Sequence, residues 1–254
     1  ERHNLGLIVF DQDQIALDDP LWKKATWQKL LIGESIRKAG LHVENVCYAD
    51  SDILVNHHAP NICELRAPGK IALVSVRKNL PYDLHLVLRR LYGHHNLPVQ
   101  QDEACMGLFV FNVLEHADLM RGWFNKYDRN VQSVTGGGDQ THVNYEMQKW
   151  GSLTWLEYRF QAMWAYEMAW KYPFLYDRHG ENQELVRECI EAALYANYFL
   201  HFAGSWHESE MWKKALTFSG ESDAVLGKYQ AYLDTPVTGQ AKGQIKPGVL
   251  EPPV

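Results

Sequence analysis

The sequence lacks the features that mark several large classes of protein. Its four cysteines (Cys47, Cys63, Cys105 and Cys189) form no C-x-x-C pair, which predicts reduced thiols in an intracellular protein and argues against a disulfide framework or a zinc site. No long uncharged apolar segment occurs, so no membrane-spanning helix is predicted. The formal net charge is −6, and this lack of a basic excess argues against a dedicated nucleic-acid binder.

The length of 254 residues suffices for one large domain with a substantial core. The chain opens on Glu1, and residues 235–254 are rich in proline and glycine, which is a linker composition. We therefore expect a globular domain over residues 1–234 and a tail or linker over residues 235–254. We also expect the chain to be part of a longer polypeptide.

Apolar runs alternate with helical patterns along the chain, which is typical of an α/β fold. Strands are predicted from the apolar runs at 5–10, 43–49, 71–76, 105–112 and 196–200. Helices are predicted at 21–38, 84–92, 116–127, 140–150, 184–194, 211–218 and 222–233. Pro20 and Gly40 mark the two ends of the first helix. The last two helices are expected to cover the sheet.

The triplet Asp50-Ser51-Asp52 lies between two apolar segments. Because alternate side chains of an extended segment point the same way, both carboxylates can face one cation. Carboxylate oxygens of this kind suit Mg²⁺ or Mn²⁺. Such triplets are common in surface turns, but open α/β sheets bind their ligands at the carboxyl ends of strands. The position of this triplet after an apolar run makes it the leading candidate for a metal site.

Glycines and one histidine supply further candidates. Three glycines at 136–138 precede Asp139-Gln140 at a predicted helix start, which indicates a loop that feeds an N-cap. A plain flexible connection is an equal alternative, and the Gly-Lys-Ser/Thr ending of a Walker loop is missing. Gly107, inside a predicted strand, indicates a bulge or a close backbone approach. His201 follows an apolar strand and is placed as a ligand, although a lone histidine is more often structural.

Aromatic side chains are concentrated in residues 151–180. Core packing is the first interpretation, and stacking on a sugar ring is the alternative. The residues concerned are Trp155, Tyr158, Phe160, Trp164, Tyr166, Trp170, Tyr172, Phe174 and Tyr176.

Four motifs, in this order, resemble those of the nucleotide-sugar glycosyltransferases of the GT-A fold, and most of all the retaining families. They are the Asp-x-Asp triplet at 50–52, the strand from Gly107 to Asn112, Asp139-Gln140 at a helix start, and His201-Phe202-Ala203-Gly204. The motifs cover most of residues 20–213. The resemblance implies a GT-A-like, Rossmann-like sheet that is mixed and mostly parallel, flanked by helices, with a helical C-terminal cover. Few residues precede Asp50, so either the first elements of such a fold are missing or the variant is compact.

The resemblance also implies a role for each candidate residue. Asp50, Asp52 and His201 would hold Mn²⁺ or Mg²⁺ against the diphosphate of the donor, and Asp139 and Gln140 would line the reacting face of the donor sugar as catalytic residues. The residues implied in donor binding are Lys29, Ser51, Gly107, Gly204 and His207. His207 stands where some of these families carry a lysine that contacts the diphosphate.

The implied function is metal-dependent transfer of a hexosyl or pentosyl group, with retention, from a UDP-sugar or other nucleotide-sugar to a glycan or glycoconjugate. The product would belong to polysaccharide biosynthesis. The expected partners are the donor and the glycan acceptor, with no nucleic acid and no transmembrane segment. A cytoplasmic location is expected, and peripheral membrane association through missing regions is left open.

Two alternatives belong to other classes of protein. Asp11 and Asp13 follow the apolar run at 5–10, which resembles the start of haloacid-dehalogenase-type phosphatases, where the first aspartate is a nucleophile. Ile15 departs from the pattern of those enzymes. A non-catalytic carbohydrate-binding or scaffold module would keep the fold without needing both Asp50 and Asp52.

Overall fold

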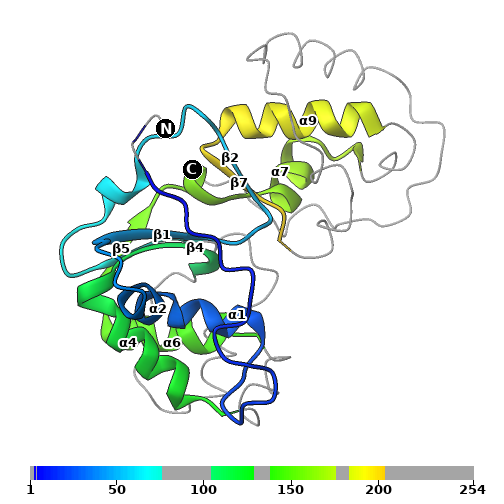
Figure 1. Cartoon of the computed structure of the whole chain (residues 1–254). Helices are drawn as coiled ribbons and strands as arrows, with labels where there is room; N and C mark the ends of the chain where they lie inside the picture. Colours follow the sequence, from blue (N-terminus) through cyan, green and yellow to red (C-terminus); the bar gives the residue numbers. More distant parts are fainter. Residues whose placement is uncertain (1–2, 4, 76–103, 129–137, 176–182, 204–254) are drawn as a thin grey trace. The chain divides into compact units, whose positions relative to one another are not determined.

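A computed structural model describes residue 3 and residues 5–75, 104–128, 138–175 and 183–203 of the chain (Figure 1). The chain divides into two compact units. Unit 1 contains the described residues within 1–48, 61–77 and 82–156, and unit 2 contains those within 49–60 and 157–254. Mixed sheets flanked by helices confirm the α/β class. In the described ranges, no helix has the length and apolar character needed to cross a membrane.

The first helical segment of unit 1 is shorter than the sequence predicts. It comprises α1 (Ala25–Gln28), the 3₁₀ turn η1 (Lys29–Leu31) and α2 (Ile32–Lys38). The preceding residues form a turn, in which the amides of Leu21 and Trp22 donate to the side chain and the backbone carbonyl of Asp19. Asp19-Pro20 therefore starts a turn and not the helix.

The end of α2 confirms the prediction for Gly40. This glycine has φ of +67°, the left-handed conformation that only glycine adopts without strain. Its amide donates to Arg37 O, and the amide of Leu41 donates to Ile36 O. These two bonds form the Schellman motif, which satisfies carbonyls at the end of a helix.

A four-stranded sheet in the order β1-β4-β3-β5 forms the centre of unit 1. Its strands are β1 (Asn45–Ala49), β3 (Ile71–Ser75), β4 (Ala104–Asn112) and β5 (Leu153–Leu156). β3 pairs antiparallel with β4 and parallel with β5. All residues of β4 are buried, which explains why this strand reads as a continuous apolar run.

The ladder between β3 and β4 is irregular at the position of Gly107. Leu73 faces Phe109, so a regular ladder would place Ser75 opposite Gly107. Ser75 instead pairs with Ala104. The glycine therefore lies in a stretch of β4 that departs from regular pairing, as the sequence predicted.

Helices α2, α4 (Val113–Lys126) and α6 (Gln140–Trp150) lie together beneath the sheet in Figure 1. The helices and the sheet enclose one apolar core. Its largest fully buried side chains include Trp27, Leu30, Ile36, Leu73, Phe109, Phe111 and Phe124.

Helix α2 approaches α4 closely because residue 33 is glycine. A Cβ added to Gly33 would lie 2.9 Å from Ala117 Cβ and 3.1 Å from Phe111 Cε2. No side chain fits there unless its neighbours move.

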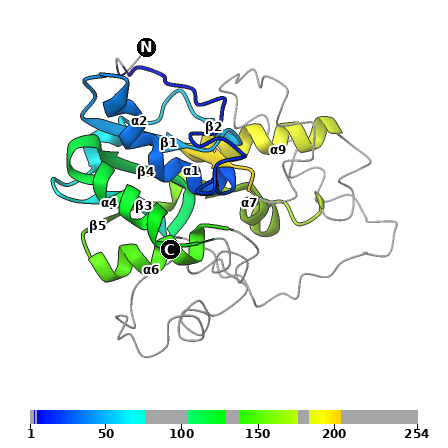
Figure 2. The same ribbon diagram turned by 60° about the horizontal axis from the view of Figure 1, so that its bottom comes forward.

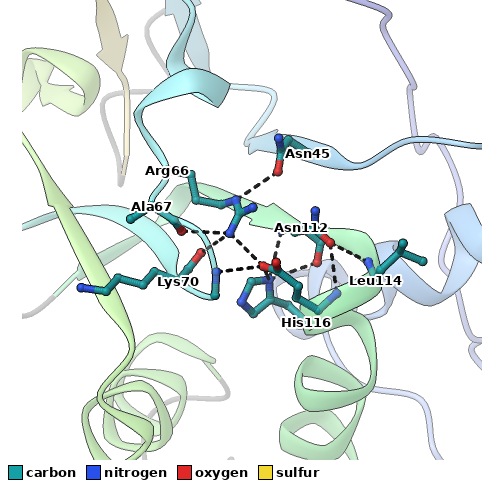
Figure 3. Close-up of polar contacts among 9 residues, drawn as sticks. Asn45, Arg66, Ala67, Lys70, Asn112, Leu114 and His116 are labelled. Atoms are coloured by element: carbon teal, nitrogen blue, oxygen red, sulfur yellow. Dashed lines mark hydrogen bonds and ion pairs between the residues drawn. The ribbon is translucent and has the colours of Figure 1, made fainter.

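Arg66, which is half-buried, links three parts of unit 1 (Figure 3). The Arg66 guanidinium donates to Asn45 Oδ1 at the start of β1, to the carbonyls of Ala67 and Lys70, and to Glu115 in the first turn of α4. Figure 3 also shows Asn112, whose side-chain oxygen accepts the amides of Leu114 and Glu115 and so caps α4. Asn112, part of the Gly107–Asn112 motif, therefore has a structural role.

Unit 2 contains a three-stranded sheet in the order β2-β7-β6. The strands are β2 (Ile53–Val55), β6 (Ala162–Met163) and β7 (Phe199–His201). β7 pairs antiparallel with β2 and parallel with β6. Parallel and antiparallel pairings are thus equally frequent among the four described registers. The 3₁₀ turn η4 (Tyr158–Gln161) leads into β6.

Helices α7 (Trp164–Lys171) and α9 (Gln183–Ala196) supply most of the apolar core of unit 2, and Figure 2 shows them from a second direction. Core packing is confirmed for several of the predicted aromatic residues: Phe160, Trp164, Tyr172 and Phe174 are buried. Asn56 holds the end of α9, because its side-chain amide donates to the carbonyls of Leu194 and Asn197.

The predicted strand at residues 5–10 is wrong. The segment belongs to none of the described sheets, and all six of its residues are exposed. Leu7 and Val9 are 87% and 70% exposed. An apolar run becomes a strand only where partner strands cover it, and no described strand pairs with this one. The helices predicted at 84–92, 211–218 and 222–233, and the tail at 235–254, lie outside the described residues.

Candidate functional site

The Asp50-Ser51-Asp52 triplet forms a turn between two strands of the chain. β1 ends at Ala49, the amide of Ile53 donates to Asp50 O over 3.2 Å, and β2 begins at Ile53. The sequence argument assumed an extended triplet, and this assumption is wrong. The two carboxylates are therefore carried by a turn and not by an extended strand.

Strand β7 brings His201 to this turn. His201 faces Ile53 in the antiparallel register, and the amide of Phe202 donates to Asp52 O over 3.0 Å. Nε2 of His201 consequently lies 3.3 Å from Oδ1 of Asp52. His201 is only 3% exposed, so the backbone ladder and the surrounding core fix the position of its ring.

Asp50, Asp52 and His201 form the carboxylate–imidazole cluster of unit 2. One ligand atom from each of the three residues lies within 4.8 Å of the others. Within the described ranges, no other group of three or more His, Cys, Asp or Glu residues has this geometry. The structure thus brings His201 to the Asp50-Ser51-Asp52 triplet, although the histidine is far from the triplet in the sequence.

The donor atoms of this cluster fit a divalent cation. Neighbouring ligands of an octahedral ion, each about 2.1 Å from the metal, are about 3 Å apart, and the Asp52 and His201 atoms are close to that separation. Two carboxylates and one neutral imidazole suit Mn²⁺, and carboxylates also suit Mg²⁺. Three protein ligands leave coordination positions for water or for phosphate oxygens.

Gln161 is a residue of this region that the sequence did not reveal. It is fully buried, and its side-chain nitrogen lies 3.2 Å from Nδ1 of His201. The parallel pairing of β6 with β7, in which Met163 faces His201, brings the end of η4 to the ring. A single glutamine in an aromatic-rich stretch carries no sequence signal of this contact.

Unit 1 contains a second group of predicted site residues. Nζ of Lys29 lies 3.3 Å from Oδ2 of Asp139, and both side chains are buried. Lys29 also donates to the carbonyl of Met106 over 2.7 Å, next to Gly107 in the irregular part of β4. Asp139 occupies the N-cap position of α6 without capping it, and Gln140 is the first residue of that helix.

Of the other residues predicted to bind the donor, one is exposed and two lie outside the described residues. Ser51 lies in the turn between the two carboxylates and is exposed. Gly204 and His207 lie outside the described residues. Lys29, Gly107, Asp139 and Gln140 belong to unit 1, whereas the carboxylate–imidazole cluster belongs to unit 2.

The structure does not support the phosphatase alternative. Asp11 and Asp13 are exposed and follow no strand. Oδ2 of Asp13 accepts a hydrogen bond from the indole nitrogen of Trp22. A nucleophilic aspartate at the end of a buried strand, which that alternative requires, is therefore missing from this position.

Three solved structures similar to this chain are those of glycosyltransferases. The galactosyltransferase LgtC, in complex with donor and acceptor sugar analogues, is 16% identical with a TM-score of 0.42, over 87% of this chain and 72% of that chain. The bifunctional glycosyltransferase WbbM is 14% identical with a TM-score of 0.46, over 82% and 38%. Mouse xyloside xylosyltransferase 1 is 12% identical with a TM-score of 0.38, over 69% and 63%.

No family model and no curated protein matches the sequence. The likeness to the three solved structures is distant. The functional proposal therefore rests on the side-chain geometry of the chain itself.

Proposed function

We propose that this chain is a metal-dependent glycosyltransferase with a GT-A-like fold, which transfers a sugar from a nucleotide diphosphate donor to a glycan or glycoconjugate. The observation that carries the proposal is the carboxylate–imidazole cluster, in which backbone pairing of β2 with β7 assembles Asp50, Asp52 and His201. The mixed sheets flanked by helices fit the fold that the sequence resemblance implies.

The cluster has the chemistry that departure of a nucleoside diphosphate requires. Asp50, Asp52 and His201 would hold Mn²⁺ or Mg²⁺, which when bound supplies a Lewis acid for the charge that develops on the diphosphate. The turn at 50–52 and the ladder at His201 hold the backbone of the three ligand residues in place.

Asp139 and Gln140 are proposed to act on the donor sugar, because the sequence resemblance implies that role. The Lys29 ammonium lies 3.3 Å from the buried Asp139 carboxylate and supplies its counter-charge. Asp139 and the Gln140 amide would stabilise positive charge at the reacting carbon, as a retaining transfer requires. The nucleotide is proposed to be UDP, the transferred group a hexosyl or pentosyl unit, and the product part of a polysaccharide or glycoconjugate.

The proposal is tested by binding and by product formation. Wild type is melted with UDP-, GDP- and CDP-sugars, each with and without Mn²⁺. A ligand at 100 times its Kd stabilises the folded state by about 2.7 kcal/mol. We expect one nucleotide to stabilise the protein only when Mn²⁺ is present, and Asp52→Asn to abolish that effect. Asp118→Asn, which changes an exposed carboxylate on α4, is the matched control and should leave the effect unchanged.

The anomeric configuration of the product made from the identified donor then distinguishes retention from inversion. Retention predicts that the anomeric configuration of the donor sugar persists in the glycoside, as measured by NMR. Inversion would contradict the role given to Asp139 and Gln140. If no nucleotide-sugar binds under any condition, the carbohydrate-binding or scaffold module becomes the better account of the chain.

A further inference from the structure

The ring of His201 lies between two side chains of opposite hydrogen-bonding character. Asp52 presents a carboxylate oxygen, and Gln161 presents an amide nitrogen. On one side, Nε2 lies 3.3 Å from Oδ1 of Asp52. On the other side, Nδ1 lies 3.2 Å from the side-chain nitrogen of Gln161. Gln161 is fully buried and His201 is 3% exposed, so solvent does not take over either contact.

These contacts determine where a neutral imidazole carries its proton. An amide nitrogen can only donate a hydrogen bond, so Nδ1 of His201 accepts from Gln161. The ring proton is then on Nε2, the nitrogen that lies 3.3 Å from Oδ1 of Asp52. In this arrangement Nε2 has no lone pair to offer a cation.

Metal binding requires the proton of the His201 ring to be on the other nitrogen. A histidine that ligates through Nε2 carries its proton on Nδ1 and donates it to a neighbouring acceptor. Gln161 can supply that acceptor only by turning its amide, so that Oε1 replaces the amide nitrogen beside Nδ1. A glutamine can serve both states, because its amide carries a donor and an acceptor at nearly equal distances from the chain.

We propose that Gln161 is a positioning residue for the metal site: its buried amide turns over when a divalent cation binds, and it thereby selects the ring tautomer in which His201 is a ligand. This inference rests on the metal site of the proposed function. It adds a residue from η4 to the three ligands.

The proposal predicts distinct effects for two replacements of Gln161. Gln161→Leu keeps a similar volume but removes the acceptor, so that a metal-bound His201 would leave its Nδ1 proton buried without a partner. Outer-shell partners of this kind change metal affinity by about 10- to 100-fold, and we expect a loss of that size in Mn²⁺ affinity. Gln161→Glu offers only acceptors and should keep the affinity within about threefold of wild type or improve it.

The experiment combines calorimetric titration with Mn²⁺ and ¹⁵N NMR of the His201 ring, whose signals are assigned by their loss in His201→Asn. In wild type, Nδ1 should be unprotonated without metal and protonated when Mg²⁺ is bound. In Gln161→Glu, Nδ1 should already be protonated without metal. This second variant keeps the proposal testable if Gln161→Leu does not fold. Gln148→Leu removes another buried glutamine, on α6 of unit 1, and should bind Mn²⁺ as wild type does.

The outcomes separate this inference from the proposed function. If wild type binds Mn²⁺ and Asp52→Asn does not, but Gln161→Leu binds like wild type, the metal site stands and the role of Gln161 is wrong. An unchanged Nδ1 signal on Mg²⁺ binding would also overturn it. If wild type binds neither cation, the metal-dependent function itself fails.

Discussion

The ammonium group of Lys29 and the carboxylate of Asp139 form a buried ion pair, in which the side chains are 4% and 5% exposed. This pair joins the 3₁₀ turn that precedes α2 to the start of α6. The same ammonium group donates to the carbonyl of Met106 and lies 5.5 Å from the ring centre of Tyr48. One lysine therefore connects β1, β4 and two helical segments of unit 1.

Removing one partner of this pair should be costly for unit 1. Lys29→Met leaves the Asp139 carboxylate buried without its counter-charge, and we expect the free energy of unfolding to fall by about 3–5 kcal/mol. Urea denaturation measures the change, and the double variant Lys29→Met/Asp139→Leu should lose less than the sum of the single variants. The surface pair of Lys38 with Glu34 is the control, because Lys38→Met should cost at most about 1 kcal/mol. Equal effects of the two lysine variants would contradict the importance of the buried pair.

Substitution of Gly33 should destabilise unit 1 even though alanine favours helices. Its new Cβ would lie 2.9 Å from Ala117 Cβ, and overpacking of this kind costs about 1–3 kcal/mol. Gly122→Ala on α4, where a Cβ meets nothing within 4 Å, should instead stabilise by up to about 1 kcal/mol. Thermal melts of the two variants give the comparison. The double variant Gly33→Ala/Ala117→Gly should lose less than the sum of its two single variants, and simple additivity would show that the new Cβ does not clash with Ala117.

Lys23 should make stability depend on alkaline pH. Its ammonium donates to the carbonyls of Phe124 and Tyr127 at the end of α4, and burial lowers its pKa from 10.5 to about 8. Between these two values the unfolded chain binds more protons than the folded protein, so this residue makes stability rise with pH. The slope is at most about 1.4 kcal/mol per pH unit.

The contribution of Lys23 is isolated by comparing wild type with Lys23→Met in urea from pH 7.5 to 10.5. Burial raises the pKa of Cys47 and Cys189 to about 12, so both thiols lower stability above about pH 9 in each protein. The stability of wild type relative to Lys23→Met should therefore increase with pH across this range. A constant difference would show that Lys23 titrates normally.

Exposed apolar residues near the N-terminus should matter little for stability. Leu7→Ser and Val9→Ser change side chains that are mostly exposed, and we expect each to alter the free energy of unfolding by no more than about 0.5 kcal/mol. Leu73→Ala, in the fully buried centre of β3, should cost about 2–5 kcal/mol. Chemical denaturation distinguishes the two cases. A large effect of Leu7→Ser would imply a packed environment for the segment at 5–10.

Local patterns predicted much of the fold. The apolar runs that became β3 and β4 are buried on both faces, and Gly40 ended its helix as expected, because turn chemistry depends on adjacent residues. The run at 5–10 has the same composition as a buried strand but remains exposed. Composition cannot distinguish these cases, since burial depends on which distant segments supply a partner.

The sequence predicted some residues of the candidate site but not others, because long-range pairing leaves no local signal. Asp50, Asp52 and His201 carry local signals, namely two carboxylates after an apolar run and an imidazole at the end of another. The way in which they meet is a long-range property, which depends on the turn after β1 and on the register of β2 with β7. Gln161 has no local signal, because only the pairing of β6 with β7 places it beside the imidazole.

The pairing of β2 with β7 also has a consequence for the order of folding. Asp52 and His201 are far apart in the sequence, and closing so long a loop is entropically costly and slow. During synthesis on the ribosome, the two carboxylates emerge long before the imidazole. A nascent chain that has not yet produced β7 therefore lacks the complete set of ligands. Tight binding of a cation at the proposed site should therefore be a late event, which would report that β2 and β7 have paired.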